Sequence, residues 1–112
     1  MDRKDLIRQY KATPRPAGVY RIQNTETSRT LVGTSVDAPA MLNRQRAQLQ
    51  MGGHPNRGLQ ADWDALGSGA FKFEILDSLT PSDEPGHDVV KDLQMLEELW
   101  VEKLGLSADL SY

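Results

Sequence analysis

The sequence predicts a small α/β domain built on a three-stranded, mostly antiparallel sheet with flanking helices, and three observations carry this prediction. Residues 18–24 and 29–34 are rich in β-branched residues and are joined by a short polar loop, which is typical of a hairpin. Residues 70–77 alternate apolar and polar side chains, as a half-buried strand does. Four segments with helical periodicity can cover these strands, in the order α-β-β-α-α-β-α.

The chain of 112 residues is long enough for a single domain over residues 1–112. The apolar spacing within residues 2–11 predicts a short amphipathic helix, so residues 1–14 form an N-terminal helical extension. Residues 17–104 form the core. The tail, residues 105–112, is expected to pack loosely or to fray, as chain ends commonly do.

Composition excludes several classes of function. Apolar residues at 38% and charged residues at 26% are typical of a soluble globular protein. No apolar run approaches the roughly 20 residues that span a membrane, and the first residues lack the apolar segment of a signal peptide. We therefore expect a cytoplasmic protein without a membrane partner. The absence of cysteine excludes disulfides, thiolate metal sites and thiol nucleophiles. The oligomeric state is left open.

The net charge of −3 conceals an uneven distribution along the chain. Residues 1–60 hold ten Lys and Arg against four Asp and Glu, whereas residues 61–112 hold three against twelve. The basic half contains the hairpin and could present a positive face to phosphates. The alternative is that the acidic half is simply solvated helix and loop, because halves of a sequence need not be halves in space.

Capping residues and apolar spacing predict three helices after the hairpin. Asp37 is a suitable N-cap for a helix over residues 39–49. Asn56 can cap the next helix, which Gly67 closes. The last helix, over residues 89–104, has an apolar stripe with helical spacing.

The hairpin carries a pair of motifs. Gly18-Val19-Tyr20 is followed eleven residues later by Leu31-Val32-Gly33, which resembles the signature hairpin of the GIY-YIG nuclease superfamily. The order of the later elements also fits, so the resemblance spans nearly all of residues 17–104. It implies an endonuclease that hydrolyses phosphodiester bonds with one divalent ion, Mg²⁺ or Mn²⁺. It also implies a nucleic-acid partner, with DNA favoured. The alternative is a catalytically degenerate domain that binds nucleic acid or a protein.

Tyr20 matches the tyrosine of the first motif, and strand alternation places it on the same face as Ile22. The resemblance implies that this tyrosine helps to activate the attacking water. A free phenol has a pKa of about 10, so it needs a nearby cation to act as a base near neutral pH. The other interpretation is a half-buried aromatic residue of the sheet.

Two positions depart from the family pattern. Leu31 stands where the second motif has tyrosine, and Met41 stands where an ungapped count places the family's arginine. Arg44 lies three residues further, almost one helical turn along the same face, and we favour it as the catalytic clamp on the phosphate. Arg46 points away from that face and is expected to contact the nucleic-acid backbone or to be solvated.

His54 follows two glycines that allow close approach to a ligand. Related enzymes place a histidine in this loop, where it can contact the phosphate or shuttle a proton, so the resemblance implies a catalytic role. The alternative is an exposed loop histidine. Arg21 and Arg57 belong to the basic half, and we predict that they contact nucleic acid together with Arg46.

Glu97 lies inside the apolar stripe of the last helix, four residues after Leu93 and three before Trp100. A carboxylate on a buried face needs a cation or strong hydrogen-bond donors, whereas Glu98 is turned about 100° away toward solvent. The family's metal-binding glutamate lies three residues before an aromatic residue, which selects Glu97. One carboxylate with waters suits Mg²⁺ or Mn²⁺. The alternative is a glutamate at the edge of the stripe that pairs with Lys or Arg.

Overall fold

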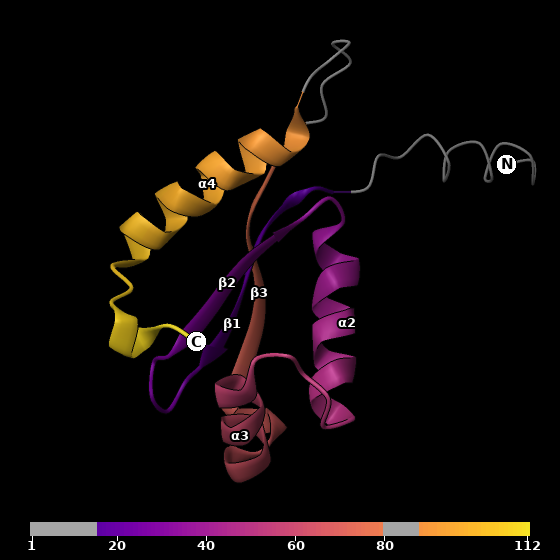
Figure 1. The fold of residues 1–112 in the computed structure, drawn as a ribbon, viewed down its shortest axis with the longest axis vertical. Coiled ribbons are helices and arrows are strands. Elements are labelled where there is room, and N and C mark those ends of the chain that lie inside the picture. Colours follow the sequence, from indigo (N-terminus) through magenta and orange to yellow (C-terminus); the bar gives the residue numbers. More distant parts are fainter. Residues whose placement is uncertain (1–15, 80–87) are drawn as a thin grey trace, which may run out of the picture.

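The sheet is three-stranded and antiparallel, as predicted. The computed structural model describes residues 16–79 and 88–112. Strand β1 (Gly18–Asn24) lies at the centre, between β2 (Thr30–Ser35) and β3 (Phe71–Ser78). Both neighbours run antiparallel to β1 (Figure 1).

Asn24 fixes the loop of the hairpin. Its backbone N–H donates to the carbonyl of Arg29 at 2.8 Å, and its side-chain Oδ1 accepts from the N–H groups of Glu26 and Thr27. Ser28 has a φ of 66°, in the left-handed region, which lets so short a loop reverse direction. The side chain of Asn24 is therefore a structural part of the turn that joins β1 to β2.

Two helices follow the hairpin, and both have the N-caps that the sequence predicts. α2 (Ala38–Gln50) begins after Asp37, whose carboxylate accepts from a backbone N–H of the first turn. α3 (Arg57–Leu66) begins after Asn56, whose side chain accepts from the N–H of Leu59. These bonds satisfy donors that a helix start leaves unpaired.

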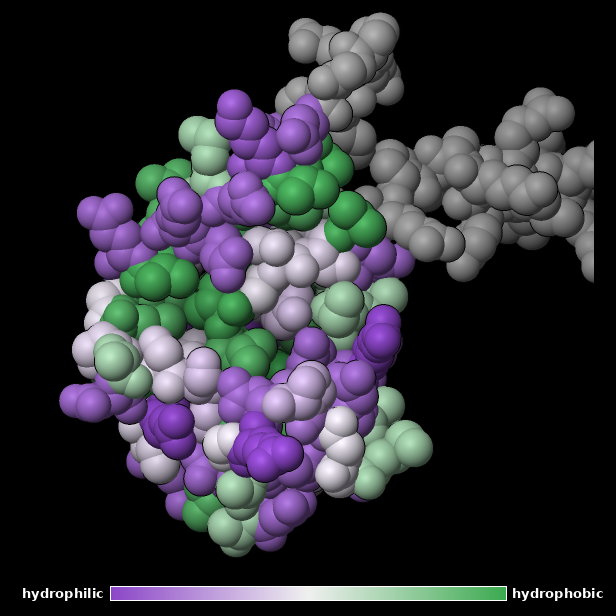
Figure 2. All heavy atoms as spheres, viewed as in Figure 1, coloured by the Kyte–Doolittle hydropathy of each residue, from purple (hydrophilic) through white to green (hydrophobic). Residues whose placement is uncertain are grey.

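The last helix, α4 (Val89–Leu104), coincides with its predicted range. Asp88 caps its start, and Gly105 ends it in the left-handed conformation. In Figure 1 the strands run between α4 on one side and α2 with α3 on the other. Three apolar side chains of α4 are exposed, and Figure 2 shows apolar surface where this helix runs. These side chains are Val90, Met95 and Leu99.

The apolar core lies between the sheet and the helices α2 and α3. Tyr20 and Ile22 enter it from β1, on the face that strand alternation predicts. Its buried members are Tyr20, Ile22, Leu42, Leu49, Leu59, Trp63, Ala70 and Phe71. Among the described residues no helix is long and apolar enough to cross a membrane. The helix predicted over residues 2–11 lies outside the described residues.

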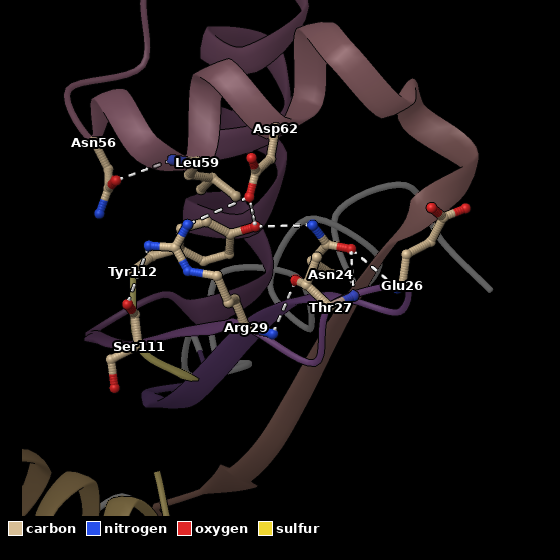
Figure 3. A network of polar contacts seen from close by, with 9 residues as sticks. All are labelled: Asn24, Glu26, Thr27, Arg29, Asn56, Leu59, Asp62, Ser111 and Tyr112. Carbon is tan, nitrogen blue, oxygen red and sulfur yellow. Dashed lines mark hydrogen bonds and ion pairs between the residues drawn. The ribbon is translucent and has the colours of Figure 1, made fainter. Parts of the chain in front are cut away.

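The last two residues of the C-terminal tail are docked on the hairpin, so the expectation that residues 105–112 pack loosely or fray is wrong for Ser111 and Tyr112. The backbone N–H of Tyr112 donates to the carbonyl of Thr30 at 3.2 Å. The Tyr112 hydroxyl donates to Asp62 Oδ2 at 2.7 Å and accepts from Asn24 Nδ2 at 3.0 Å (Figure 3). These contacts join the end of the chain to α3 and to the hairpin loop.

Candidate active site

Tyr20 is buried at the centre of the sheet, with 5% of its surface exposed. Its backbone pairs with Gly33 of β2, and its ring covers that glycine so closely that an added Cβ would overlap the ring. Gly18 is needed for a similar reason, because an added Cβ would overlap the backbone of Asp77 in β3. The glycines of both hairpin motifs therefore allow close approach, one by the tyrosine ring and the other by the next strand.

Gln45 of α2 reaches the tyrosine hydroxyl. Its side-chain Nε2 donates to Tyr20 Oη at 3.5 Å, and its Oε1 is hydrogen-bonded to Nε2 of His54. Gln45 is not among the site residues that the sequence motifs predict. The available signal was its position four residues after Met41, on the same face of the helix that the family uses for its arginine.

His54 is buried, with 7% of its surface exposed, so the alternative of an exposed loop histidine is wrong. Its backbone N–H donates to Gln60 Oε1 at 3.0 Å, and its ring Nδ1 accepts from the N–H of Asn56 at 3.0 Å. Burial lowers the pKa of His54. The imidazole is therefore neutral at physiological pH and faces Gln45.

Glu97 lies half-buried on α4. Burial raises the pKa of Tyr20, the donor from Gln45 opposes this change, and the charge of Glu97 raises that pKa further. The carboxylate is thus close enough to the phenol to act on its ionisation. Trp100, one turn along α4, donates from Nε1 to Asp77 Oδ2 at 3.1 Å and ties the helix to β3.

The two positions that depart from the family pattern are apolar contacts. Leu31 and Met41 are partly buried and pack against the core cluster that contains Tyr20. The Met41 sulfur lies 3.7 Å from Nε2 of Gln45. Neither side chain adds a charge or a strong hydrogen-bonding group beside the phenol.

The predicted arginines are separated in the structure. Arg44 and Arg57 are exposed and, within residues 16–79 and 88–112, make no hydrogen bond or ion pair. Arg21 forms an ion pair with Glu74, with Nη2 and Oε2 2.5 Å apart. The guanidinium of Arg46 lies over the Phe73 ring, 4.5 Å from its centroid.

The polar groups brought together are therefore Tyr20, Gln45, His54 and Glu97, which come from β1, α2, the loop before α3, and α4. The described residues contain no group of three or more His, Asp or Glu side chains that could hold a metal ion. A metal ion in this region would depend on Glu97, water and the ligands of a substrate.

Comparison with known proteins shows the fold. No family model and no curated protein matches the chain. Among solved structures, a mutant of the catalytic domain of intron endonuclease I-TevI matches with a TM-score of 0.67 and 23% identity, over 87% of this chain and 91% of that one. The catalytic domain of homing endonuclease I-TevI matches with a TM-score of 0.67 and 22% identity, over 85% and 96%. The chain therefore has the GIY-YIG fold, which confirms at the level of the fold what its hairpin motifs predict.

Proposed function

We propose that this chain is a metal-dependent endonuclease domain that hydrolyses phosphodiester bonds in nucleic acid, with DNA as the favoured substrate. The main observation behind this proposal is the placement of Tyr20, which is held by a donor from α2 and influenced by the charge of Glu97 on α4. Both structural neighbours are catalytic domains of endonucleases, which supports the same activity for this chain.

The donor set fits a single hard divalent ion. Glu97 offers one carboxylate that is half-buried but not sealed from solvent, and Mg²⁺ is commonly bound by one or two carboxylates together with water and phosphate oxygens. When bound there, Mg²⁺ or Mn²⁺ would neutralise negative charge that develops on the scissile phosphate.

Tyr20 would act on the attacking water. Because burial raises its pKa, the phenol is protonated near neutral pH and orients the water through a hydrogen bond. Deprotonation of the phenol would require added positive charge nearby. Arg44 is exposed on α2 and is not engaged by another described side chain, so it remains our candidate for the phosphate clamp.

The basic residues outside the site would hold the nucleic-acid backbone. Arg57 is exposed at the start of α3, and Arg46 is exposed on α2. Arg21 would have to exchange its ion pair with Glu74 for a phosphate, so we expect it to contribute least to binding.

Nicking of supercoiled plasmid tests the proposal. The wild type, Glu97→Gln and Tyr20→Phe are compared in Mg²⁺ and then in Mn²⁺. Glu98→Gln is the matched control, because Glu98 is exposed on the same helix. We expect the wild type and Glu98→Gln to nick the plasmid and the other two variants to lose nicking while keeping the wild-type circular dichroism spectrum. Undiminished nicking by Glu97→Gln would contradict the proposal.

The alternative, a nucleic-acid-binding module without catalysis, is favoured by Leu31 and Met41. Both side chains are apolar and packed against the core, where the family has polar groups. This alternative predicts no cleavage of plasmid, branched DNA or RNA. It predicts binding whose affinity falls as salt rises, because neutralising phosphates releases counterions. A protein-binding module would show no such dependence on nucleic acid and salt.

A further inference from the structure

A directed chain of hydrogen bonds leads from the backbone of Asn56, the N-cap of α3, to the tyrosine of the candidate site. The N–H of Asn56 donates to Nδ1 of His54 at 3.0 Å, so this ring nitrogen carries no proton. A neutral imidazole then carries its proton on Nε2. That N–H donates to Gln45 Oε1.

The same logic orients the amide of Gln45. Because its Oε1 accepts from His54, its NH₂ group faces the other way and donates to Tyr20 Oη at 3.5 Å. The amide cannot be flipped without placing two donors against each other at His54. The direction of every bond in the chain thus follows from a single backbone N–H.

A second buried amide fixes the start of this chain. Gln60, with 8% of its surface exposed, accepts from the backbone N–H of His54 at 3.0 Å. Its Nε2 donates to the carbonyl of Leu49 at 3.0 Å and to Asp64 Oδ1 at 2.9 Å. The end of α2 and the first turns of α3 therefore hold His54 in place, and the position of Gln45 follows.

The chain ends at an oxygen that only accepts. Among the described residues Tyr20 Oη has Gln45 as its hydrogen-bond partner and no acceptor for its own proton. The hydroxyl proton is therefore directed away from α2. A donor to the oxygen also favours the phenolate, which opposes the effect of burial.

We propose that Gln45 is a positioning residue, whose amide, oriented by His54, keeps the Tyr20 oxygen as an acceptor and leaves the hydroxyl proton available to the reacting water. His54 then acts through Gln45 and does not contact the phosphate. The catalytic meaning of this inference rests on the proposed nuclease function, whereas the effect of Gln45 on the phenol does not.

A spectroscopic titration tests the effect on the phenol. Tyrosinate absorbance is followed against pH in the wild type, Gln45→Met and Gln45→Glu, and the same protein with Tyr20→Phe is subtracted in each case. Gln45→Met has a similar shape but donates no hydrogen bond, so the titration of Tyr20 should move to higher pH. Gln45→Glu, which can only accept from the phenol, should move it further. The control is Gln50→Met, an exposed residue at the end of α2, which should change nothing.

An unchanged titration of Tyr20 in both Gln45 variants would overturn the proposal. If Gln45→Met does not fold, Gln45→Glu still accepts from His54 and decides the test alone. The readout needs no cleavage, so a shifted titration in a protein that cuts no nucleic acid would reject the nuclease and keep the positioning role of Gln45.

If the wild type cleaves, kinetics give a second readout. Gln45→Met should lower kcat about twofold to tenfold, the range expected for one lost hydrogen bond, and should leave KM unchanged. Because the protonated phenol is the active form, the rate should fall as Tyr20 ionises, and this falling limb of the pH–rate profile should move to higher pH together with the spectroscopic titration. Cleavage with wild-type kcat and pH profile in Gln45→Met would reject the positioning role and keep the nuclease.

Discussion

Tyr20 in the candidate site and Tyr112 in the C-terminal tail have similar surroundings but differ in the hydrogen bonds that their hydroxyl groups make. The hydroxyl of Tyr20 accepts from the amide of Gln45 at 3.5 Å, and that of Tyr112 accepts from the amide of Asn24 at 3.0 Å. Burial is the largest cause of a raised pKa in both. They differ in the proton, because Tyr112 donates it to Asp62 at 2.7 Å (Figure 3). No described residue accepts the proton of Tyr20.

The difference distinguishes a structural phenol from one that can act on another molecule. The hydroxyl of Tyr112 has both a donor and an acceptor. Its ring is also covered, because Arg29 lies 4.3 Å from the ring centroid and pairs with Asp62 at 3.5 Å (Figure 3). Tyr20 is more deeply buried than Tyr112 but keeps one hydrogen-bonding function unused. In a buried aromatic residue, the unused donor rather than the burial therefore indicates function.

The largest effect is expected from Tyr20→Phe. Loss of the hydroxyl should lower the rate of plasmid nicking by about 100-fold or more, the scale of a lost acid–base group. The free energy of unfolding should change by less than about 1 kcal/mol, because a single long hydrogen bond is lost. Plasmid nicking and urea unfolding measure the two quantities. A large loss of stability with normal nicking would make Tyr20 structural, like Tyr112.

Gly33→Ala should displace the Tyr20 ring. The added Cβ would overlap the ring, so we expect a loss of about 1–3 kcal/mol in the free energy of unfolding, together with most of the nicking activity. Gly69→Ala is the control, because an added Cβ at Gly69 has no neighbour within 4 Å. Equal effects of the two substitutions would show that the contact between ring and glycine is unimportant.

Tyr112→Phe should have the reverse outcome of Tyr20→Phe. It leaves the Asn24 amide and the Asp62 carboxylate without their shared partner, which should cost about 1–2 kcal/mol in urea unfolding. Nicking at a temperature where the variant is folded should equal that of the wild type. A loss of nicking in the folded variant would mean that the tail also serves the site.

The smallest effect concerns acid stability. Because the pKa of His54 is lowered by burial, its stabilising contribution is complete above the unfolded pKa of about 6.5 and is lost as pH falls toward the lower folded pKa. Protonated Nδ1 could no longer accept from Asn56. The wild type should therefore lose stability faster than His54→Gln as pH falls below about 6.5, as measured by urea unfolding at several pH values. Parallel curves would contradict this assignment.

Local sequence patterns predicted the elements and their faces. Asp37 and Asn56 predicted the helix starts, and alternation placed Tyr20 on the same face as Ile22, because capping and strand period depend only on neighbouring residues. The alternation over residues 70–77 implies that Ile75 shares a face with Phe71, yet Ile75 is 41% exposed whereas Phe71 is buried. Sequence periodicity predicts the face of a strand on which a side chain lies, but it does not predict whether another element packs over that side chain.

The contacts that sequence reasoning missed join distant residues. Gln45 bonds to a tyrosine 25 positions earlier, and an amide in a helix belongs to no motif. Burial of His54 depends on Gln60, and docking of Tyr112 depends on Asn24, 88 positions away. Such pairings arise from tertiary structure, so composition and spacing could not identify them. Whether Arg44, His54 and Glu97 catalyse a reaction stays a prediction.

The hydrogen bond from Trp100 to Asp77 affects how far the chain between β3 and α4 can change in length. The Glu97 helix is attached directly to β3, beside the point where the pairing of β1 with β3 shifts register between Val19 and Tyr20. The connection between Ser78 and Val89 therefore need not set the distance from carboxylate to phenol. Because extra residues between two fixed points add little entropic cost, a change in the length of the chain between β3 and α4 should be tolerated while Glu97 keeps its place beside Tyr20.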